Sequence, residues 1–180
     1  GPAASSTAAR ASSQPRFSYS GQGIRLLQRV GERVTGRALQ DHMRTAVFEP
    51  LGMTSSSFVW RDDYAVRKAF GHGPAESSAG RSRITQAQAA SSLETTAADY
   101  ARFLLAAVRG TSLRADLARE FLRPQVALEQ GCIICLGEPR HALSPHHWAL
   151  GFGLERAGDR TFAWHWGDNE TMQSYAAIDS

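Results

Sequence analysis

The sequence predicts an α+β fold in which helices come first and a short antiparallel sheet follows. Apolar residues recur at helical spacing over residues 24–34 and again over residues 96–108. Nearer the C-terminus, two short apolar runs, 148–154 and 161–166, flank Ala157-Gly158-Asp159, a pattern typical of a β-hairpin. Because the helical patterns precede the strand patterns, we expect helices and sheet to occupy separate parts of the domain.

The first two predicted helices have clear stop signals. The first stops at Thr35-Gly36, since glycine is the commonest residue just past a helix end. The second spans residues 39–47 and ends before Pro50, because the residue before a proline disfavours helical geometry. A turn at 51–53 and a short extended piece at 57–60 follow. The apolar residues at helical spacing in the first helix are Ile24, Leu27, Val30 and Val34.

Two further helices and the remaining strand complete the prediction. Thr95 or Thr96 caps a helix that Gly110 ends, and a helix over 113–122 stops at Pro124. The predicted buried side of the first of these carries Tyr100, Phe103, Leu104 and Ala107. Residues 71–82 and 124–147 are expected to be irregular, and residues 174–178 to form the last strand.

Composition limits the classes of protein that this chain can belong to. It has 180 residues, 42% of them hydrophobic, which suits one globular domain. Residues 1–16, rich in Ala and Ser, are expected to be a disordered arm, and residues 17–180 to form the domain. The net charge is +3, but the arginines are scattered and no basic run has interleaved aromatics, so no nucleic-acid partner is expected. No stretch approaches the ~20 consecutive apolar residues of a membrane span. The sequence indicates no particular cellular compartment.

Four pieces of sequence, in this order and spacing, point to a family. They are Phe17-Ser18-Tyr19-Ser20-Gly21-Gln22-Gly23 with Val34-Thr35-Gly36, then Val47-Phe48-Glu49-Pro50-Leu51-Gly52-Met53 with Ser57-Phe58, then Ser92 to Tyr100, and last Trp164-His165-Trp166-Gly167-Asp168-Asn169. Together they resemble the class C β-lactamase-like serine hydrolases, which include D-alanyl-D-alanine carboxypeptidases and esterases. The resemblance runs from about Phe17 to the C-terminus. It implies a partial β-lactamase/transpeptidase-like fold and, for the complete protein, a small acyl substrate.

The resemblance also implies roles for individual residues. In that family a serine and a lysine form an S-x-x-K motif, a tyrosine in a Y-x-N motif moves protons, and an H-x-G motif faces the substrate. Tyr19 matches the tyrosine, although Gly21 stands where asparagine is commonest. His165 and Gly167 match the H-x-G motif. The backbone N–H of Asp168 is expected in the oxyanion hole, and Asn169 as a substrate contact. No metal or organic cofactor is implied.

One motif of the family is missing from this sequence. Lys68 is the only lysine, and the residue three before it is Ala65, so no S-x-x-K can be formed. In the family that motif lies upstream of the tyrosine, which would place it before Gly1. The chain also stops inside the predicted last strand. We therefore expect part of a hydrolase, inactive as this chain alone. The alternative is a non-catalytic binding module whose open sheet edges invite self-association or a complementing segment.

Ordinary structural roles fit the same residues. Tyr19 is a plausible amphipathic residue at a helix entrance, and Ser20 is expected to be an N-cap. Strand alternation puts His165 on one face and both neighbouring tryptophans on the other, so it also fits a hydrogen-bonded histidine beside the core. Lys68 is expected to be a solvated charge.

The two cysteines allow three interpretations. Cys132 and Cys135 form a C-x-x-C pair, and His141 with His146 or His147 follows, which is tolerable spacing for a tetrahedral zinc site. The pair also fits a redox or loop disulfide. We favour inert loop thiols over both. Dithiol titration with metal analysis decides, because equimolar zinc in purified protein contradicts this preference.

Overall fold

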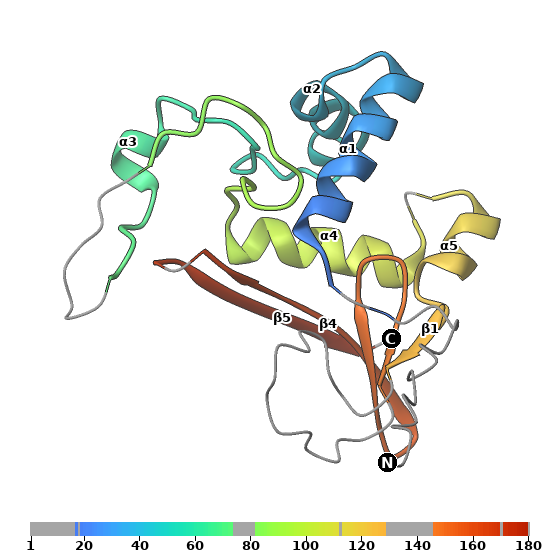
Figure 1. The fold of residues 1–180 in the computed structure, drawn as a ribbon. Coiled ribbons are helices and arrows are strands. Elements are labelled where there is room, and N and C mark those ends of the chain that lie inside the picture. Colours follow the sequence, from blue (N-terminus) through green and yellow to red (C-terminus); the bar gives the residue numbers. More distant parts are fainter. Residues whose placement is uncertain are drawn as a thin grey trace, which may run out of the picture.

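The computed structural model describes residues 17, 19–73, 82–111, 113–128, 146–169 and 171–179, except the side chain of His146. The predicted N-terminal arm, residues 1–16, lies outside the described residues. The helices are α1 (Gly21–Thr35), α2 (Leu39–Met43) continued by a π-helical segment (Arg44–Phe48), α3 (Tyr64–Arg67), α4 (Ala97–Arg109) and α5 (Ala115–Phe121). The strands are β1 (Val126–Leu128), β2 (His146–Trp148), β3 (Gly153–Ala157), β4 (Arg160–Asp168) and β5 (Gln173–Asp179). Figure 1 confirms the α+β arrangement, with helices before the sheet.

The strands form one antiparallel sheet in which every strand pairs with its neighbour in sequence, in the order β1-β2-β3-β4-β5. The predicted hairpin is confirmed: β3 and β4 are joined through Gly158-Asp159, with Ala157 opposite Arg160. Gly158 has a φ of 63°, the left-handed geometry that tight hairpin turns require and that glycine adopts without steric cost.

Two strand boundaries differ from the prediction. The run 148–154 is not one strand, because Trp148 ends β2, a turn closes where the Ala149 N–H donates to the Phe152 carbonyl, and Gly153 begins β3. The segment 124–147, expected to be irregular, contains β1 and the start of β2. Three-residue strands are too short to show an alternating pattern, and pairing with neighbouring strands creates them.

The helix ends follow the sequence signals closely. Ser20 caps α1, its hydroxyl accepting from the Gly23 N–H at 3.1 Å, and Gly36 ends that helix in left-handed geometry. Thr96 caps α4 by accepting from the Asp99 N–H at 3.2 Å. The predicted second helix is α2 with its π-helical continuation, and α5 is shorter than predicted.

Each face of the sheet has its own apolar cluster. On the helix side, Leu104 of α4 packs with Leu154 and Ala163, so α4 covers this face (Figure 1). On the other face, Leu128, Trp148 and Trp164 pack together. A third cluster, Phe48, Met53 and Phe58, is formed within the segment that follows α2 and packs against Leu39 and Met43 of that helix.

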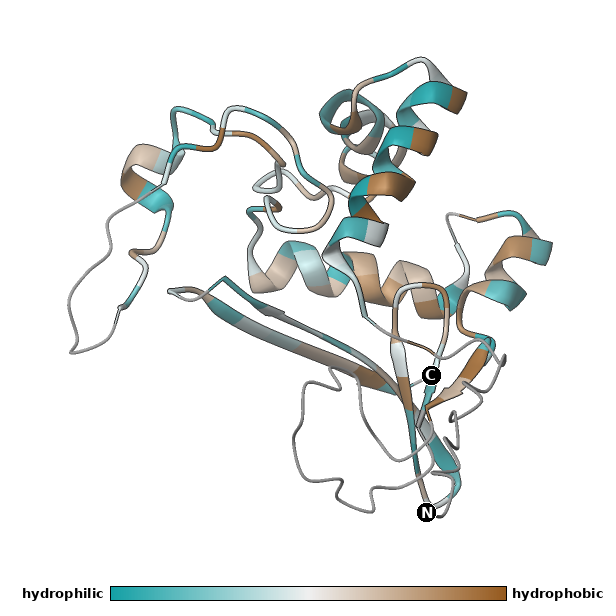
Figure 2. Cartoon of the chain, viewed as in Figure 1, coloured by the Kyte–Doolittle hydropathy of each residue, from teal (hydrophilic) through white to brown (hydrophobic). Residues whose placement is uncertain are grey.

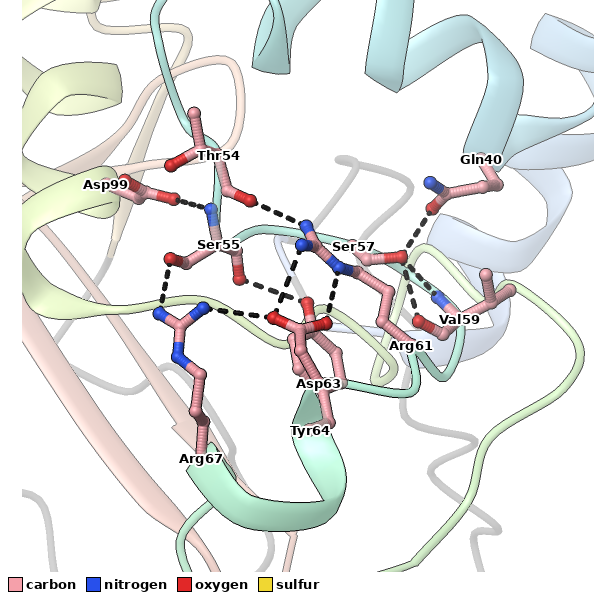
Figure 3. A network of polar contacts seen from close by, with 10 residues as sticks. All are labelled: Gln40, Thr54, Ser55, Ser57, Val59, Arg61, Asp63, Tyr64, Arg67 and Asp99. Atoms are coloured by element: carbon pink, nitrogen blue, oxygen red, sulfur yellow. Dashed lines mark hydrogen bonds and ion pairs between the residues drawn. The ribbon is translucent and has the colours of Figure 1, made fainter.

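The segment between α2 and α4 is held by a polar network, drawn in Figure 3. The Asp63 carboxylate accepts from both Arg61 and Arg67. Arg67 also donates to the Ser55 hydroxyl, and the Ser55 N–H donates to the buried Asp99 carboxylate on α4 at 2.8 Å. This chain of contacts ties α3 to the first turn of α4.

Lys68 was expected to be solvated, and that prediction is wrong. Its side chain is only 9% exposed at the end of α3, and its ammonium pairs with the Glu94 carboxylate and donates to the Ser82 carbonyl. Sequence could not show this, because Glu94 lies in a distant segment that the tertiary fold brings alongside. Within the described residues, no helix is long and apolar enough to cross a membrane.

Candidate functional site

The candidate site lies where β4 extends past β3. β3 pairs with β4 only as far as Trp164, whereas β5 pairs with it as far as Asp168. The last residues of β4 therefore have a strand on one side only, within the described part of the sheet. The Tyr19 ring lies beside this segment, with its centroid 6.0 Å from that of His165 and 5.0 Å from that of Trp166. The structure thus brings together the predicted tyrosine and histidine.

Tyr19 is held by the start of α1 and by the apolar cluster on the outer face of the sheet. It directly precedes Ser20, whose extended backbone and capping hydroxyl fix the direction in which the chain enters the helix. Its ring packs edge-on against Trp148 at 6.0 Å. Burial raises the pKa of the Tyr19 phenol. Among the described residues, no ion pair or cation–ring contact involves Tyr19, so nothing there counters that shift.

His165 is oriented by a hydrogen bond between its ring and the neighbouring backbone. Its Nδ1 lies 2.7 Å from the Trp166 carbonyl oxygen, and since a carbonyl oxygen only accepts, Nδ1 carries the proton. In the neutral form of the ring, Nε2 then has the lone pair. Burial lowers the pKa of the His165 imidazole, and the hydrogen bond to Trp166 opposes that shift. The predicted alternation is confirmed, because His165 is paired with Ala176 of the helix-side cluster while Trp164 and Trp166 belong to the outer one.

The residues after His165 shape the open side of the site. Gly167 pairs with Ser174 of β5, and a Cβ on Gly167 would come within 2.7 Å of the Ser174 hydroxyl oxygen. Asp168 pairs with Gln173 at the end of the hairpin. An open hollow of about 450 Å³ is lined by Trp166, Gly167, Asp168, Gln173, Ser174 and Tyr175. The hollow is therefore bordered by Gly167 of the H-x-G segment.

Asn169 lies beside the site, and one of its two amide N–H groups is used within the protein. Its Nδ2 donates to the Ser91 carbonyl at 3.2 Å, and its backbone N–H donates to the Met172 carbonyl at 3.0 Å. These bonds tie the β4–β5 turn to the segment before α4. The second N–H of the amide and Oδ1 remain for a substrate contact from Asn169.

Four of the side chains considered as zinc ligands lie outside the described residues. They are those of Cys132, Cys135, His141 and His146. The part of the chain that the structure describes contains no group of three or more His, Cys, Asp or Glu side chains able to hold a metal ion.

The aromatic walls of the site were not predicted from the sequence. Trp166 stacks on His165 with ring centroids 5.4 Å apart and an interplanar angle of 21°, and Trp148 lies 5.8 Å from the same ring. The position of Trp166 directly after His165, inside the H-x-G motif, is the signal that could have indicated it. No local signal indicates Trp148, because β2 reaches the site only through pairing with β3.

Comparison with known proteins identifies the family. A family model described as Beta-lactamase matches residues 3–179. A search of curated proteins found no match. Among solved structures, the fold is similar to an octameric penicillin-binding protein homologue from Pyrococcus abyssi, with 17% identity, a TM-score of 0.74 and coverage of 92% of this chain and 36% of that one. It is also similar to a class C beta lactamase from Rhodobacter sphaeroides, with 16% identity, a TM-score of 0.69 and coverage of 90% and 51%.

A penicillin-binding protein from Bacillus halodurans gives the same result, with 20% identity, a TM-score of 0.70 and coverage of 91% of this chain and 48% of that one. At these identities the likeness shows a shared fold. The chain spans about half the length of these structures, or less. The family match over nearly the whole sequence, together with this fold, shows that the chain belongs to the Beta-lactamase family of serine hydrolases.

Proposed function

We propose that this chain supplies the tyrosine and histidine side of an acyl-transfer site. In the complete site, a serine attacks a β-lactam, a D-alanyl peptide or an ester, and water then hydrolyses the acyl-enzyme. The observation that carries this proposal is the meeting of the Tyr19, His165 and Trp166 rings beside Gly167 and Asp168.

Proton transfer is the role proposed for Tyr19. A serine hydroxyl is a weak nucleophile until a neighbouring base takes its proton. A phenol serves as that base only when a nearby cation favours its ionised form. Burial raises the pKa of Tyr19, so the described residues leave the phenol protonated at neutral pH. The cation that activates it has to come with the nucleophile.

The H-x-G segment has two proposed tasks. The Asp168 backbone N–H, together with the N–H of the nucleophile, holds the oxyanion. In this role the carboxylate of Asp168, an exposed residue, has to point away from that charge. Binding a substrate carboxylate requires a proton donor at His165 Nε2, whereas accepting a proton requires the lone pair that the neutral ring has there. The neutral tautomer therefore favours proton transfer at His165 over carboxylate binding. Gly167 and Asn169 contact the substrate.

The nucleophile is proposed to come from outside this sequence. The residue three positions before Lys68 is Ala65, so the S-x-x-K motif cannot end at Lys68. The Lys68 ammonium pairs instead with the Glu94 carboxylate. We therefore expect no hydrolysis of nitrocefin or p-nitrophenyl acetate by this chain above the buffer rate. Turnover that is present in the chain and lost in Tyr19→Phe would refute this expectation. A natural gene with an upstream S-x-x-K supports the enzyme.

A non-catalytic interaction module is the second candidate function. Within the described sheet, β5 pairs only with β4, and most of its residues are exposed. An open edge of this kind pairs readily with another strand. Size-exclusion chromatography with light scattering tests this candidate. Concentration-dependent association that Ala177→Lys abolishes supports it, and a monomer at all concentrations counts against it.

A further inference from the structure

The β4–β5 turn directly follows Asp168, whose backbone N–H is proposed for the oxyanion hole. The next N–H along the chain, that of Asn169, donates across the hairpin to the Met172 carbonyl at 3.0 Å. Successive residues of an antiparallel strand direct their N–H groups to opposite sides. The Asp168 N–H therefore points to the edge of β4 away from β5, where β3, within the described sheet, no longer pairs. An N–H at this edge serves a substrate only if the turn holds its direction.

Apolar packing contributes little to holding this turn. None of the apolar clusters of described residues includes a residue between Gly167 and Ser174, and Met172 is 39% exposed. Figure 2 shows the turn end of the β4–β5 hairpin as mainly hydrophilic, whereas hydrophobic residues lie further along the two strands. The direction of the Asp168 N–H therefore depends on polar bonds.

The Asn169 side chain provides one of these bonds. Its Nδ2 donates to the Ser91 carbonyl at 3.2 Å. On the other side of the turn, the His72 N–H donates to the Thr171 carbonyl at 2.9 Å. Because Asn169 is the next residue after Asp168, its bond acts more directly on the Asp168 N–H than the bond from His72 does.

The Ser91 carbonyl belongs to a firmly held stretch, residues 87–92, which we call the bridging segment. The adjacent Ser92 is 2% exposed. Its hydroxyl donates to the Phe58 carbonyl at 2.9 Å and accepts from the Gln88 N–H at 2.8 Å. The exposed Asn169 amide is thus bonded to a stretch of backbone that a buried hydroxyl holds in place.

The bridging segment also bonds to the helix that follows Tyr19. Gln28 of α1 donates to the Ala87 carbonyl at 3.1 Å and accepts from the Ala89 N–H at 2.9 Å. One segment is therefore bonded both to the helix after the proposed proton-transfer residue and to the turn after Asp168. Through it, the bond from Asn169 relates the position of the Asp168 N–H to that of Tyr19.

We infer that Asn169 is a positioning residue, whose amide bond to the Ser91 carbonyl sets the direction of the Asp168 N–H relative to Tyr19. This inference rests on the proposed function, because Asp168 and Tyr19 have their roles there. An oxyanion donor has to lie about 2.7–3.1 Å from the oxyanion. A misplacement of about 1 Å can cost about a hundredfold in rate, so one hydrogen bond that fixes this direction matters for the site.

Nuclear magnetic relaxation of the ¹⁵N-labelled full chain tests the inference. Asn169→Ala removes the donor, and Asn169→Asp keeps the shape of the side chain but has no N–H to donate. We expect the order parameter of the Asp168 N–H to fall from about 0.85 to about 0.6 in both variants. Agreement between them separates the hydrogen bond from the added charge. Because Asn169 is exposed, the circular dichroism should stay unchanged.

Gln173→Ala is the matched control. It removes another exposed amide side chain, opposite Asp168 in the same hairpin, that has no hydrogen bond to a described residue. This variant should leave the order parameter of Asp168 unchanged. An equal fall in Gln173→Ala overturns the inference, as does an unchanged order parameter in either Asn169 variant, even if its urea midpoint falls. The proposed function fails separately, if the natural gene has no upstream S-x-x-K, and that result does not alter the order parameters.

Discussion

Replacing Gly153 by alanine tests the packing of the tryptophan next to the candidate site. Gly153 pairs with Trp164 across β3 and β4, and the Trp164 ring lies over the glycine. An added Cβ would come within 2.5 Å of both Cε2 and Cζ2 of that ring. Carbon atoms prefer separations of about 3.5–4.0 Å, so the ring must move by roughly 1 Å.

The movement of this ring is costly because its surroundings are filled. Trp164 is 9% exposed and meets Trp148 edge-on at 6.0 Å. Overpacking of a core costs about 1–3 kcal/mol, and removing a glycine from a strand returns about 0.5–1 kcal/mol. From the middle of each range, we therefore expect Gly153→Ala to lower the free energy of unfolding by about 1 kcal/mol.

Urea unfolding, followed by tryptophan fluorescence and far-ultraviolet circular dichroism, measures this loss. The control is Gly31→Ala in the middle of α1, where nothing lies within 4 Å of the added Cβ. That variant should gain about 0.5–1 kcal/mol, so the same chemical change has opposite signs at the two positions. If Gly153→Ala is as stable as the parent chain, the Trp164 ring does not lie as close to Gly153 as the structure places it.

Three further predictions concern buried polar groups. Asp99→Ala should lower the free energy of unfolding by about 3 kcal/mol in urea, because the 2%-exposed carboxylate accepts from backbone, hydroxyl and guanidinium donors; a loss under about 1 kcal/mol contradicts this. Lys68→Met should cost about 1–3 kcal/mol, and much less in a Glu94→Gln background, since the unpaired Glu94 carboxylate causes most of the loss; equal losses in both backgrounds contradict it. The lowered pKa of His165 means that the unfolded chain binds its proton more readily, so this residue stabilises the fold above pH ~6.5 and that contribution is lost as the pH falls towards the folded-state pKa. Urea unfolding between pH 8 and 5 should show a smaller decline in His165→Gln, and identical declines would show that burial does not shift this group.

The parts of the fold that the sequence predicted are those set by neighbouring residues. Ser20 and Thr96 cap α1 and α4, and Gly36 ends the first of these helices, because a cap needs only the residues within one turn. The β3–β4 hairpin follows in the same way from Gly158 at the turn. The family motifs around Tyr19 and His165 were also visible, since each lies within a few consecutive residues.

What the sequence left undetermined depends on contacts between distant segments. The family motifs, the helix caps and the hairpin each depend on residues close together in the sequence. The family and most ends of helices and strands could therefore be predicted from the sequence. Lys68 is buried because Glu94 lies beside it, and the β2–β3 turn brings Trp148 against Tyr19. The Gln28 side of α1 packs against the segment before α4 because Gln28 bonds to residues that follow it by about sixty positions. Local spacing shows that a helix has two sides, but only the hydrogen bonds and packing of the folded chain determine which side meets the protein.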